Sequence, residues 1–299
     1  RVISSLHPRA LEECMRRWIS SLQSSLSGEV VAVDGKSLRG AFDRAGSTTP
    51  LHLLHVWATE QRLLLAQRAV AGASGEIGAI PELLELLDIE GATITSDANG
   101  CTPAVAGAVH NGKANYVLAL KGNRGPLYAH VKALFDGLQD RDFAGTKGQT
   151  QLQSGHGRQE QRTVRVVEPL SWPGEYQRKW KGLRTAVLAE RSRTVNGATS
   201  VERHYFLSSL PPKPKQIAHA IRSHWGVENN LHWTLDVVFD EDRQRIRNKQ
   251  GAENFAVINR LALMLLQRNK SKSIRLQRKL AGWDGPFLLS VLTRGLSIT

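Results

Sequence analysis

The sequence predicts an α/β fold in which a mixed sheet is flanked by helices. Three short apolar segments come first and are joined by polar turns, which is typical of an antiparallel meander. Helical and strand-like patterns then alternate, which predicts that parallel strands join the sheet. The pattern changes to alternating strands after about residue 142, and from residue 216 it is helical to the end.

A helix and a strand open the chain. Residues 8–26 carry apolar side chains at helical spacing, and Gly28 suits a position just past a helix end. Residues 29–34 are rich in β-branched residues and predict a buried strand that ends on Asp34. The other elements of the first half are, in chain order, strands at 50–58 and 62–70, a helix at 75–88, a strand from 91 that ends on Asp97, a helix at 102–112, a strand at 114–120 and a helix from Gly125.

The middle of the chain predicts a small basic β insertion. Residues 143–160 are rich in Gly, Gln, Ser and Thr and show no apolar period. Alternating strands follow at 162–168, 183–193 and 202–210, separated by turn sequences. The segment PPKPK at 211–215 then predicts a stiff linker into the helical region.

Charge is distributed unevenly along the 299 residues. The net charge is +13 and the pI about 10.1. Residues 1–140 hold 13 Lys and Arg against 14 acids, whereas residues 141–299 hold 27 against 13. A basic half joined to a neutral half favours a polyanion partner, most simply nucleic acid, over a solvated basic surface.

Several classes of protein are disfavoured by composition. No apolar run approaches the roughly 20 residues that a membrane helix needs, and the N-terminal residues do not resemble a signal peptide. Cys14 and Cys101 are too few for a disulfide framework, so we expect two free thiols in a reducing compartment. The sequence begins with Arg1 rather than Met, so we expect the coding sequence to be longer.

Asp34 opens the motif Asp-Gly-Lys-Ser, for which three interpretations compete. A phosphate-binding loop needs a glycine where Val30 stands, which disfavours it. The second interpretation is a plain Asp-Gly turn at a strand end. The third is a metal ligand, because a carboxylate at the tip of a buried strand is poorly hydrated. Asp97 has the same setting, so two aspartates from parallel neighbouring strands could share a Mg²⁺ at one sheet edge.

A third carboxylate is expected from residues 221–242. Glu228 lies among aromatic and apolar residues, and on a helix it would share a face with His224 and Leu231. An acid on the core side is costly unless a charged group meets it, and the alternative is an exposed glutamate. Four later acids are rival ligands: Asp236, Asp240, Glu241 and Asp242.

Other catalytic centres have little support in the sequence. The histidine pairs His52/His55 and His224/His232 have no Cys partners and lack zincin spacing, which disfavours zinc. The sequence contains no G-x-S-x-G elbow, and nothing in it points to a Ser-His-Asp triad.

Five motifs carry a resemblance to a known family. In chain order they are AVDGKSLRG (32–40), AIPELLELLDIEGATITSDANGC (79–101), YVLALKGN (116–123), HGRQEQR (156–162) and HWGVENNLHWTLDVVFDED (224–242). Through them, residues 1–269 resemble the H-repeat-associated insertion-sequence transposases of the DDE class (ISAs type).

The resemblance implies a fold and a division of the chain. It implies an RNase H-like, retroviral-integrase-like mixed sheet flanked by helices, with an inserted small β subdomain and a helical C-terminal region. We therefore expect residues 1–28 to be the helical end of an N-terminal segment and 29–142 the first part of the catalytic core. The basic β insertion would be 143–212, and the helical remainder, with the third acid, 213–299.

The resemblance also implies the chemistry and the partners. Asp34, Asp97 and Glu228 would form the acidic triad and hold two Mg²⁺ ions, with Mn²⁺ able to substitute. The substrate would be double-stranded DNA, both transposon ends and target, bound by a homodimer or larger assembly in the bacterial cytoplasm, with no membrane association. Candidate DNA contacts are Lys36, Lys121, Arg124, Arg158, Arg162, Arg243, Arg245 and Arg247.

The sequence departs from the family pattern near the triad. Ser96 precedes the second aspartate where the family favours an apolar residue, and Asn99 replaces a Met. His224 and Leu235 stand where related transposases often place basic residues. Two alternatives therefore stay open: a metal-dependent nuclease of the same fold without strand transfer, and an inactive DNA-binding transposase remnant.

Overall fold

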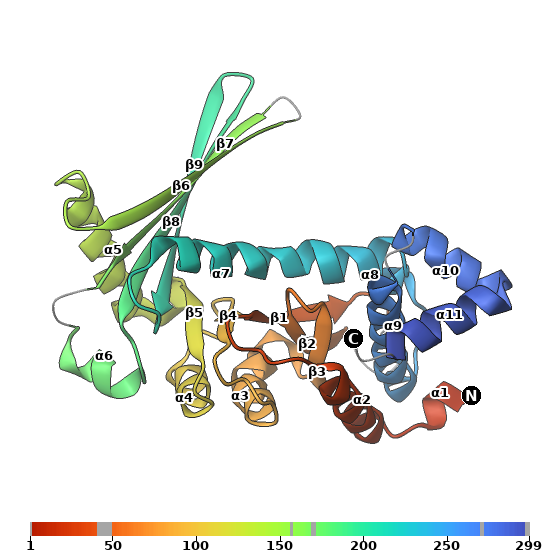
Figure 1. Ribbon diagram of the computed structural model, residues 1–299. Helices are drawn as coiled ribbons and strands as arrows, with labels where there is room; N and C mark the ends of the chain where they lie inside the picture. Colours follow the sequence, from red (N-terminus) through yellow and green to blue (C-terminus); the bar gives the residue numbers. More distant parts are fainter. Residues whose placement is uncertain (1, 41–49, 156–157, 169–171, 270–271, 297–299) are drawn as a thin grey trace. The chain divides into compact units, whose positions relative to one another are not determined.

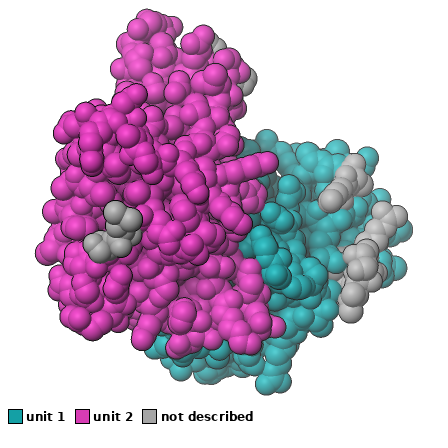
Figure 2. Space-filling model, turned by 60° about the vertical axis from the view of Figure 1, so that its left-hand side comes forward, with its two compact units in different colours: residues 1–87, 225–299 teal, residues 88–224 magenta. Residues whose placement is uncertain are grey.

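The chain folds into two compact units. The computed structural model describes residues 2–40, 50–155, 158–168, 172–269 and 272–296. Unit 1 comprises residues 1–87 and 225–299, and unit 2 comprises residues 88–224 (Figure 2). Among the described helices, none is both long and apolar enough to cross a membrane.

Unit 1 is built on a three-stranded antiparallel meander, as predicted. Strand β1 (Val30–Leu38) pairs with β2 (Leu51–Ala58), which pairs with β3 (Leu63–Val70) (Figure 1). The register places Asp34 opposite His55, and His55 opposite Gln67. Since residues opposite one another point to the same face of a sheet, these three side chains form one row across the meander.

Strand β1 does not end on Asp34, so that prediction is wrong. The strand continues through Gly35, and its pairing with β2 runs to Leu38 opposite Leu51. The physical reason lies on both faces of the extension. Leu38 is fully buried, and Gly35 leaves room for the carboxylate of Glu76, which a Cβ at this position would approach to 1.7 Å. Asp34 therefore lies within the strand, because Gly35 and Leu38, which follow it, both pack against neighbouring groups.

Helices cover both faces of the unit 1 sheet. Helix α3 (Gly72–Glu85) packs against all three strands, while α2 (Pro8–Leu22) packs against β3 and α9 (Lys249–Arg268) against β2 and β3. A small core joins α9 to the sheet through Leu38, Leu51, Leu53, Ala252 and Ala256. The other helices of this unit are α1 (Val2–Ser5), α8 (Trp233–Val237), α10 (Ile274–Trp283) and α11 (Gly285–Leu296), with a 3₁₀ turn, η3, at Glu241–Arg243.

Unit 2 contains the predicted parallel pair of strands. Strand β4 (Thr93–Ser96) pairs in parallel with β5 (Asn115–Leu120), and α4 (Pro103–Asn111) connects them. A 3₁₀ turn, η1 (Gly122–Arg124), leads into α5 (Gly125–Gln139). Cys101 is buried here and Cys14 is exposed in unit 1, and both are free thiols as predicted.

Two long hairpins extend the sheet of unit 2. Strand β9 (Ala198–Ser208) pairs with β5 and with β8 (Thr185–Val195), which is followed in the sheet by β7 (Arg158–Val167) and β6 (Lys147–Gly155) (Figure 1). Strand β6 and the short helix α6 (Gly174–Lys179) were not predicted. Apart from Leu152 and two glycines, the residues of β6 are polar, and almost all of the strand is exposed, so it shows no apolar alternation and is held by its ladder to β7.

Candidate metal centre

Three metal-ligating side chains of unit 1 converge at one point. Asp34 comes from β1, and Glu228 and His232 come from a π-helical segment, η2 (Glu228–His232). His232 Nδ1 lies 3.5 Å from Asp34 Oδ2 and 3.3 Å from Glu228 Oε2. One ligand atom from each residue lies within 4.8 Å of the others, which is the spacing that a shared cation requires. We call Asp34, Glu228 and His232 the acid–histidine cluster.

The π segment sets the exposure of Glu228. Helix α7 (Pro214–Val227) continues directly into η2 and then into α8. Leu231 and His232 are buried, but the Glu228 side chain is 70% exposed, which agrees with the alternative of an exposed glutamate. Glu228 is the first residue of the π segment, and a π turn holds one residue more than an α turn. Such segments are frequent at functional sites.

Asp97 lies in unit 2, directly after β4. Its Oδ1 accepts hydrogen bonds from the backbone N–H groups of Asn99 at 2.9 Å and Gly100 at 3.4 Å. These bonds form a tight Asx-type turn that orients the carboxylate. The Asn123 side chain supports the same turn by donating to the carbonyl of Ala98 at 2.9 Å. The convergence of Asp97 with Asp34 stays a prediction, because the two aspartates belong to different units.

His224 also lies in unit 2, four residues before Glu228 in the sequence. Its Nδ1 lies 3.0 Å from the hydroxyl of Thr95, two residues before Asp97. Burial lowers the pKa of His224 to about 4. The imidazole is therefore neutral near pH 7, and it joins α7 to β4 without supplying a positive charge.

A fully buried polar network lies beneath the acid–histidine cluster. Arg260 on α9 donates to both carboxylate oxygens of Glu241, at 2.7 and 3.1 Å, and to His55 Nε2 at 2.8 Å. The His55 ring lies 5.6 Å from the His232 ring. Burial, followed by the charge of Arg260, holds the pKa of His55 well below its usual value. His55 is thus a neutral acceptor that links this network to His232.

Lys36 and Asp236 form a separate ion pair beside the cluster. The Lys36 side chain is 8% exposed, and its ammonium pairs with Asp236 and lies 3.4 Å from the His232 carbonyl oxygen. Burial raises the pKa of Asp236, while the hydrogen bond and charge of Lys36 oppose that rise. Lys36 was predicted to contact DNA, but its ammonium is instead engaged inside the fold.

The other rival acids are also engaged. Glu241 is held by Arg260, Asp240 lies 3.6 Å from Arg243, and Asp242 accepts a bond from the Arg39 backbone N–H at 3.4 Å. Sequence reasoning missed His232 as a member of the cluster. The available signal was its position four residues after Glu228, which places two potential ligands on one side of a helix.

The predicted DNA-contacting cations differ in their availability. Arg162 lies 2.6 Å from Glu160 and donates to Gln153 at 3.1 Å, so its charge is largely used within the β insertion. Arg124 is half-buried. The exposed members of the predicted set are Lys121, Arg158, Arg243, Arg245 and Arg247.

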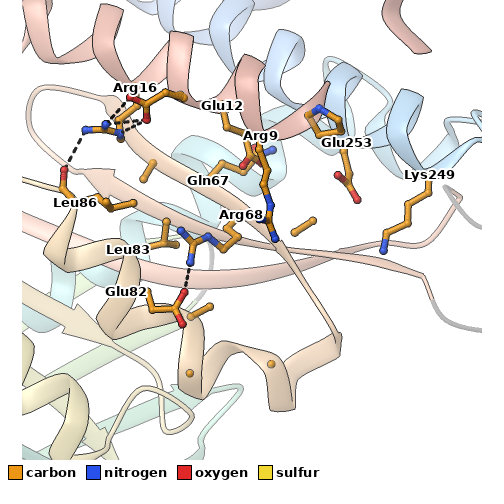
Figure 3. A pocket seen from close by; sticks show the side chains of 17 residues that line it. Arg9, Glu12, Arg16, Gln67, Arg68, Glu82, Leu83, Leu86, Lys249 and Glu253 are labelled. Carbon is orange, nitrogen blue, oxygen red and sulfur yellow. Dashed lines mark hydrogen bonds and ion pairs between the residues drawn. The ribbon is translucent and has the colours of Figure 1, made fainter. Parts of the chain in front are cut away.

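A polar pocket of about 720 Å³ lies elsewhere in unit 1, between α2, β3, α3 and the start of α9 (Figure 3). Two ion pairs line it: Arg16 Nη2 lies 2.8 Å from Glu13 Oε2, and Arg68 Nη1 lies 2.6 Å from Glu82 Oε2. Burial and the nearby charge of Glu253 raise the pKa of Glu12 to about 7. No member of the acid–histidine cluster lines this pocket, so it is not the metal centre.

Comparison with known proteins gives a consistent result. The family model described as "Transposase DDE domain" matches residues 25–265. The protein YncI of Escherichia coli O157:H7, which is named as a transposase, is 35% identical over 93% of this chain and 72% of its own length. YhhI of E. coli K12, named as an H repeat-associated transposase, is 34% identical over 99% of this chain and 80% of its own length.

Among solved structures, the piggyBac transposase in a synaptic complex with hairpin DNA gives a TM-score of 0.44 at 12% identity. The match covers 90% of this chain and 53% of that one. This similarity is too low for an argument from shared structure.

Proposed function

The chain belongs to the family of DDE transposases and is a transposase of the insertion-sequence type, and on that premise we propose that Asp34, Asp97 and Glu228 carry its chemistry. The proposed reaction has two steps, hydrolysis of a phosphodiester at a transposon end and attack of the freed 3′-OH on target DNA. Both steps are in-line displacements at phosphorus, so a single site can serve both.

The observation that carries the proposal is the convergence of Asp34, Glu228 and His232 within 4.8 Å. Two carboxylates and an imidazole nitrogen are suitable donors for a divalent cation. The residues come from segments nearly 200 positions apart in sequence, so local sequence alone does not explain their proximity. Family members generally use a divalent metal, and the donor set fits one.

Each residue of the proposed site would have a distinct role in metal binding. Asp34 and Asp97 would hold Mg²⁺ or Mn²⁺, with Glu228 completing the ligand set of a two-ion site. When bound, these ions would stabilise charge on the attacking and leaving oxygens. His232 would offer Nδ1 as a further ligand beside Asp34 and Glu228, and Lys36 would keep Asp236 out of the ligand set. Because Glu228 is exposed, its carboxylate can adjust when substrate enters.

DNA would be bound through backbone charge. The basic half of the chain supports this, as do the exposed cations Lys121, Arg158, Arg243, Arg245 and Arg247. We also propose an RNase H-like core, supported by the β1–β3 meander of unit 1 and the parallel β4–β5 pair of unit 2. Synapsis of two transposon ends would require a homodimer or larger assembly.

The test uses a donor plasmid that carries the coding sequence with its native flanking DNA, incubated with purified protein, target plasmid and Mg²⁺ or Mn²⁺. We expect cleaved ends and joined products, both abolished by Asp34→Asn. The control, Asp242→Asn, changes an aspartate outside the cluster and should remain active.

The alternatives give distinct results. Cut DNA without joined products would favour a nuclease. DNA binding by the unmutated protein without cleavage in either metal would favour an inactive remnant. Activity that survives Asp34→Asn would contradict the assignment of the metal centre.

A further inference from the structure

A three-residue hydrogen-bond relay lies in unit 1 outside the metal centre. The Ser37 hydroxyl on β1 lies 2.8 Å from His52 Nδ1 on β2, and His52 Nε2 lies 2.5 Å from Glu76 Oε1 on α3. The His52 and Glu76 side chains are only 10% and 5% exposed, whereas Ser37 is exposed to solvent. An accessible hydroxyl is thus hydrogen-bonded to a buried imidazole–carboxylate pair.

The backbone is shaped to hold this relay. Ser37 and His52 are directly opposite one another in the β1–β2 ladder, which explains the contact between them. Gly35 precedes Ser37 on the same face of β1, and a Cβ there would come within 1.7 Å of Glu76 Oε1 and 2.7 Å of His52 Nε2. The absence of a side chain at Gly35 is therefore what admits the carboxylate.

The contacts fix the direction of hydrogen bonding. An ionised Glu76 can only accept, so His52 Nε2 carries the proton and donates to it. His52 Nδ1 then has a lone pair, and the Ser37 hydroxyl donates to that nitrogen. This is the arrangement of a serine nucleophile with a general base and an orienting acid, with the two imidazole nitrogens used in the opposite sense to the serine-protease triad.

The relay is separate from the acid–histidine cluster. Side chains alternate along β1, so Asp34, Lys36 and Leu38 point to the face covered by α9, while Gly35 and Ser37 point to the face covered by α3. Substitution at Ser37 therefore leaves the metal ligands and the Lys36–Asp236 pair in place.

We propose that Ser37, His52 and Glu76 form a second, metal-independent nucleophilic site that accepts acyl groups from carboxylic esters. Ser37 Oγ would bond to the ester carbonyl carbon while its proton passes to His52 Nδ1. The carbon–alkoxide bond then breaks, and the leaving alkoxide takes that proton as an alcohol. Water hydrolyses the acyl-serine through the same base, which releases a carboxylic acid and restores Ser37. Glu76 acts as a positioning residue, because it bonds to His52 and takes no part in the bonds that form and break.

The test is covalent labelling of the full chain in EDTA with an alkyl fluorophosphonate. The Ser37 oxygen would displace fluoride from phosphorus and remain bonded to it, and mass spectrometry of peptides locates the adduct. We expect one adduct, at Ser37, and turnover of p-nitrophenyl acetate in the same buffer. Ser37→Ala should abolish both, and His52→Gln should slow both at least tenfold.

Ser20→Ala is the matched control, because Ser20 is an exposed serine on α2 whose hydroxyl bonds only to the Arg16 carbonyl among the hydrogen bonds described. It should label at the unmutated rate. Absence of the adduct in the unmutated chain, or equal labelling after Ser37→Ala, would overturn the proposal. If His52→Gln fails to fold, as judged by circular dichroism, Glu76→Gln replaces it. That variant should slow labelling, and an unchanged labelling rate would overturn the relay.

Discussion

Glu228 and Glu241 occupy neighbouring stretches of one acidic segment, but their surroundings are opposite. The Glu228 side chain is 70% exposed, and its carboxylate lies 3.3 Å from His232 Nδ1. Glu241 is fully buried, and both of its oxygens accept from Arg260. A carboxylate that is already saturated by a buried guanidinium cannot also take a metal without leaving that cation unpaired.

The difference separates structural acids from available ones. Arg260 and Glu241 must stay together because each would be costly to bury alone. Glu228 is exposed and is not held by a buried cation, so its carboxylate can change partners during a reaction. The same contrast recurs among cations, since Arg158 is exposed while Arg162 is paired with Glu160.

The largest expected effect is on activity, at Glu228. Replacing Glu228 with Gln keeps the size of the side chain but removes a metal-binding charge, so cleavage in Mg²⁺ should fall by roughly two orders of magnitude or more. DNA binding should be retained or improve, because a negative charge near phosphate is gone. Cleavage of the donor plasmid and parallel binding titrations measure the two effects.

Asp236→Asn is the comparison for that experiment, since Asp236 is engaged with Lys36. It should reduce cleavage much less. Full activity of the Glu228→Gln protein together with loss in the Asp236→Asn protein would move the third ligand to Asp236.

The next effect is on stability, at Glu241. Replacing Glu241 with Gln leaves the Arg260 guanidinium buried without its counter-charge, and we expect the free energy of unfolding to fall by about 3–5 kcal/mol. Glu228→Gln is the control and should change it by less than about 0.5 kcal/mol. Urea denaturation followed by circular dichroism measures both. Equal stability of the two variants would show that burying Arg260 without the charge of Glu241 costs little, which would contradict this prediction.

Glu12 is more buried than Glu228 but less buried than Glu241, and its effect on the free energy of unfolding depends on pH. Its folded pKa of about 7 lies above the usual value of 4.5, so the folded state binds the proton more tightly than the unfolded state. The contribution of Glu12 to stability is therefore greatest below about pH 4.5 and is lost as pH rises through 7. Glu12→Gln should stabilise the chain by about 1–3 kcal/mol at pH 8 and by little at pH 4.5. Thermal melts at the two pH values test this, and a gain of the same size at both would contradict the assignment.

The smallest effect should be on DNA binding by the β insertion. Arg158→Glu should weaken binding to unrelated DNA sequences about equally and reduce the slope of log affinity against log salt by about 1. Arg162→Glu should change the slope less, because Arg162 is already paired with Glu160. Fluorescence anisotropy at several salt concentrations gives both slopes. A larger change at Arg162 would mean that DNA competes successfully for the ion pair.

The sequence predicted those elements whose apolar side chains form a continuous run or recur at helical spacing. The β1–β3 meander, the parallel β4–β5 pair and the C-terminal helices were all visible in this way. Strand β6 was not, because its one apolar side chain, Leu152, leaves no periodic signal.

Parts of the candidate site were beyond sequence reasoning because they depend on tertiary contacts. The pattern predicts a DNA contact at Lys36, because nothing local in the sequence shows its pairing with Asp236, 200 positions away. Strand β1 was ended too early, because the space that Gly35 leaves for Glu76 cannot be read from the Asp-Gly pair itself. The contact between Asp34 and His232 likewise depends on the packing of β1 against η2, which the sequence does not reveal.

The π segment makes this part of the chain sensitive to length as well as to composition. Asn229 and Asn230 are exposed, and substitution at either should be tolerated. Deleting one of them would be different, because the segment could then close as an ordinary α turn. A π turn takes up one residue more than an α turn over the same rotation, so Glu228 would stay in phase with Leu235, while Glu228 and His232 would come to lie three residues apart instead of four. An in-frame loss of a single codon would thus keep every ligand of the metal centre and change only the spacing of two of them.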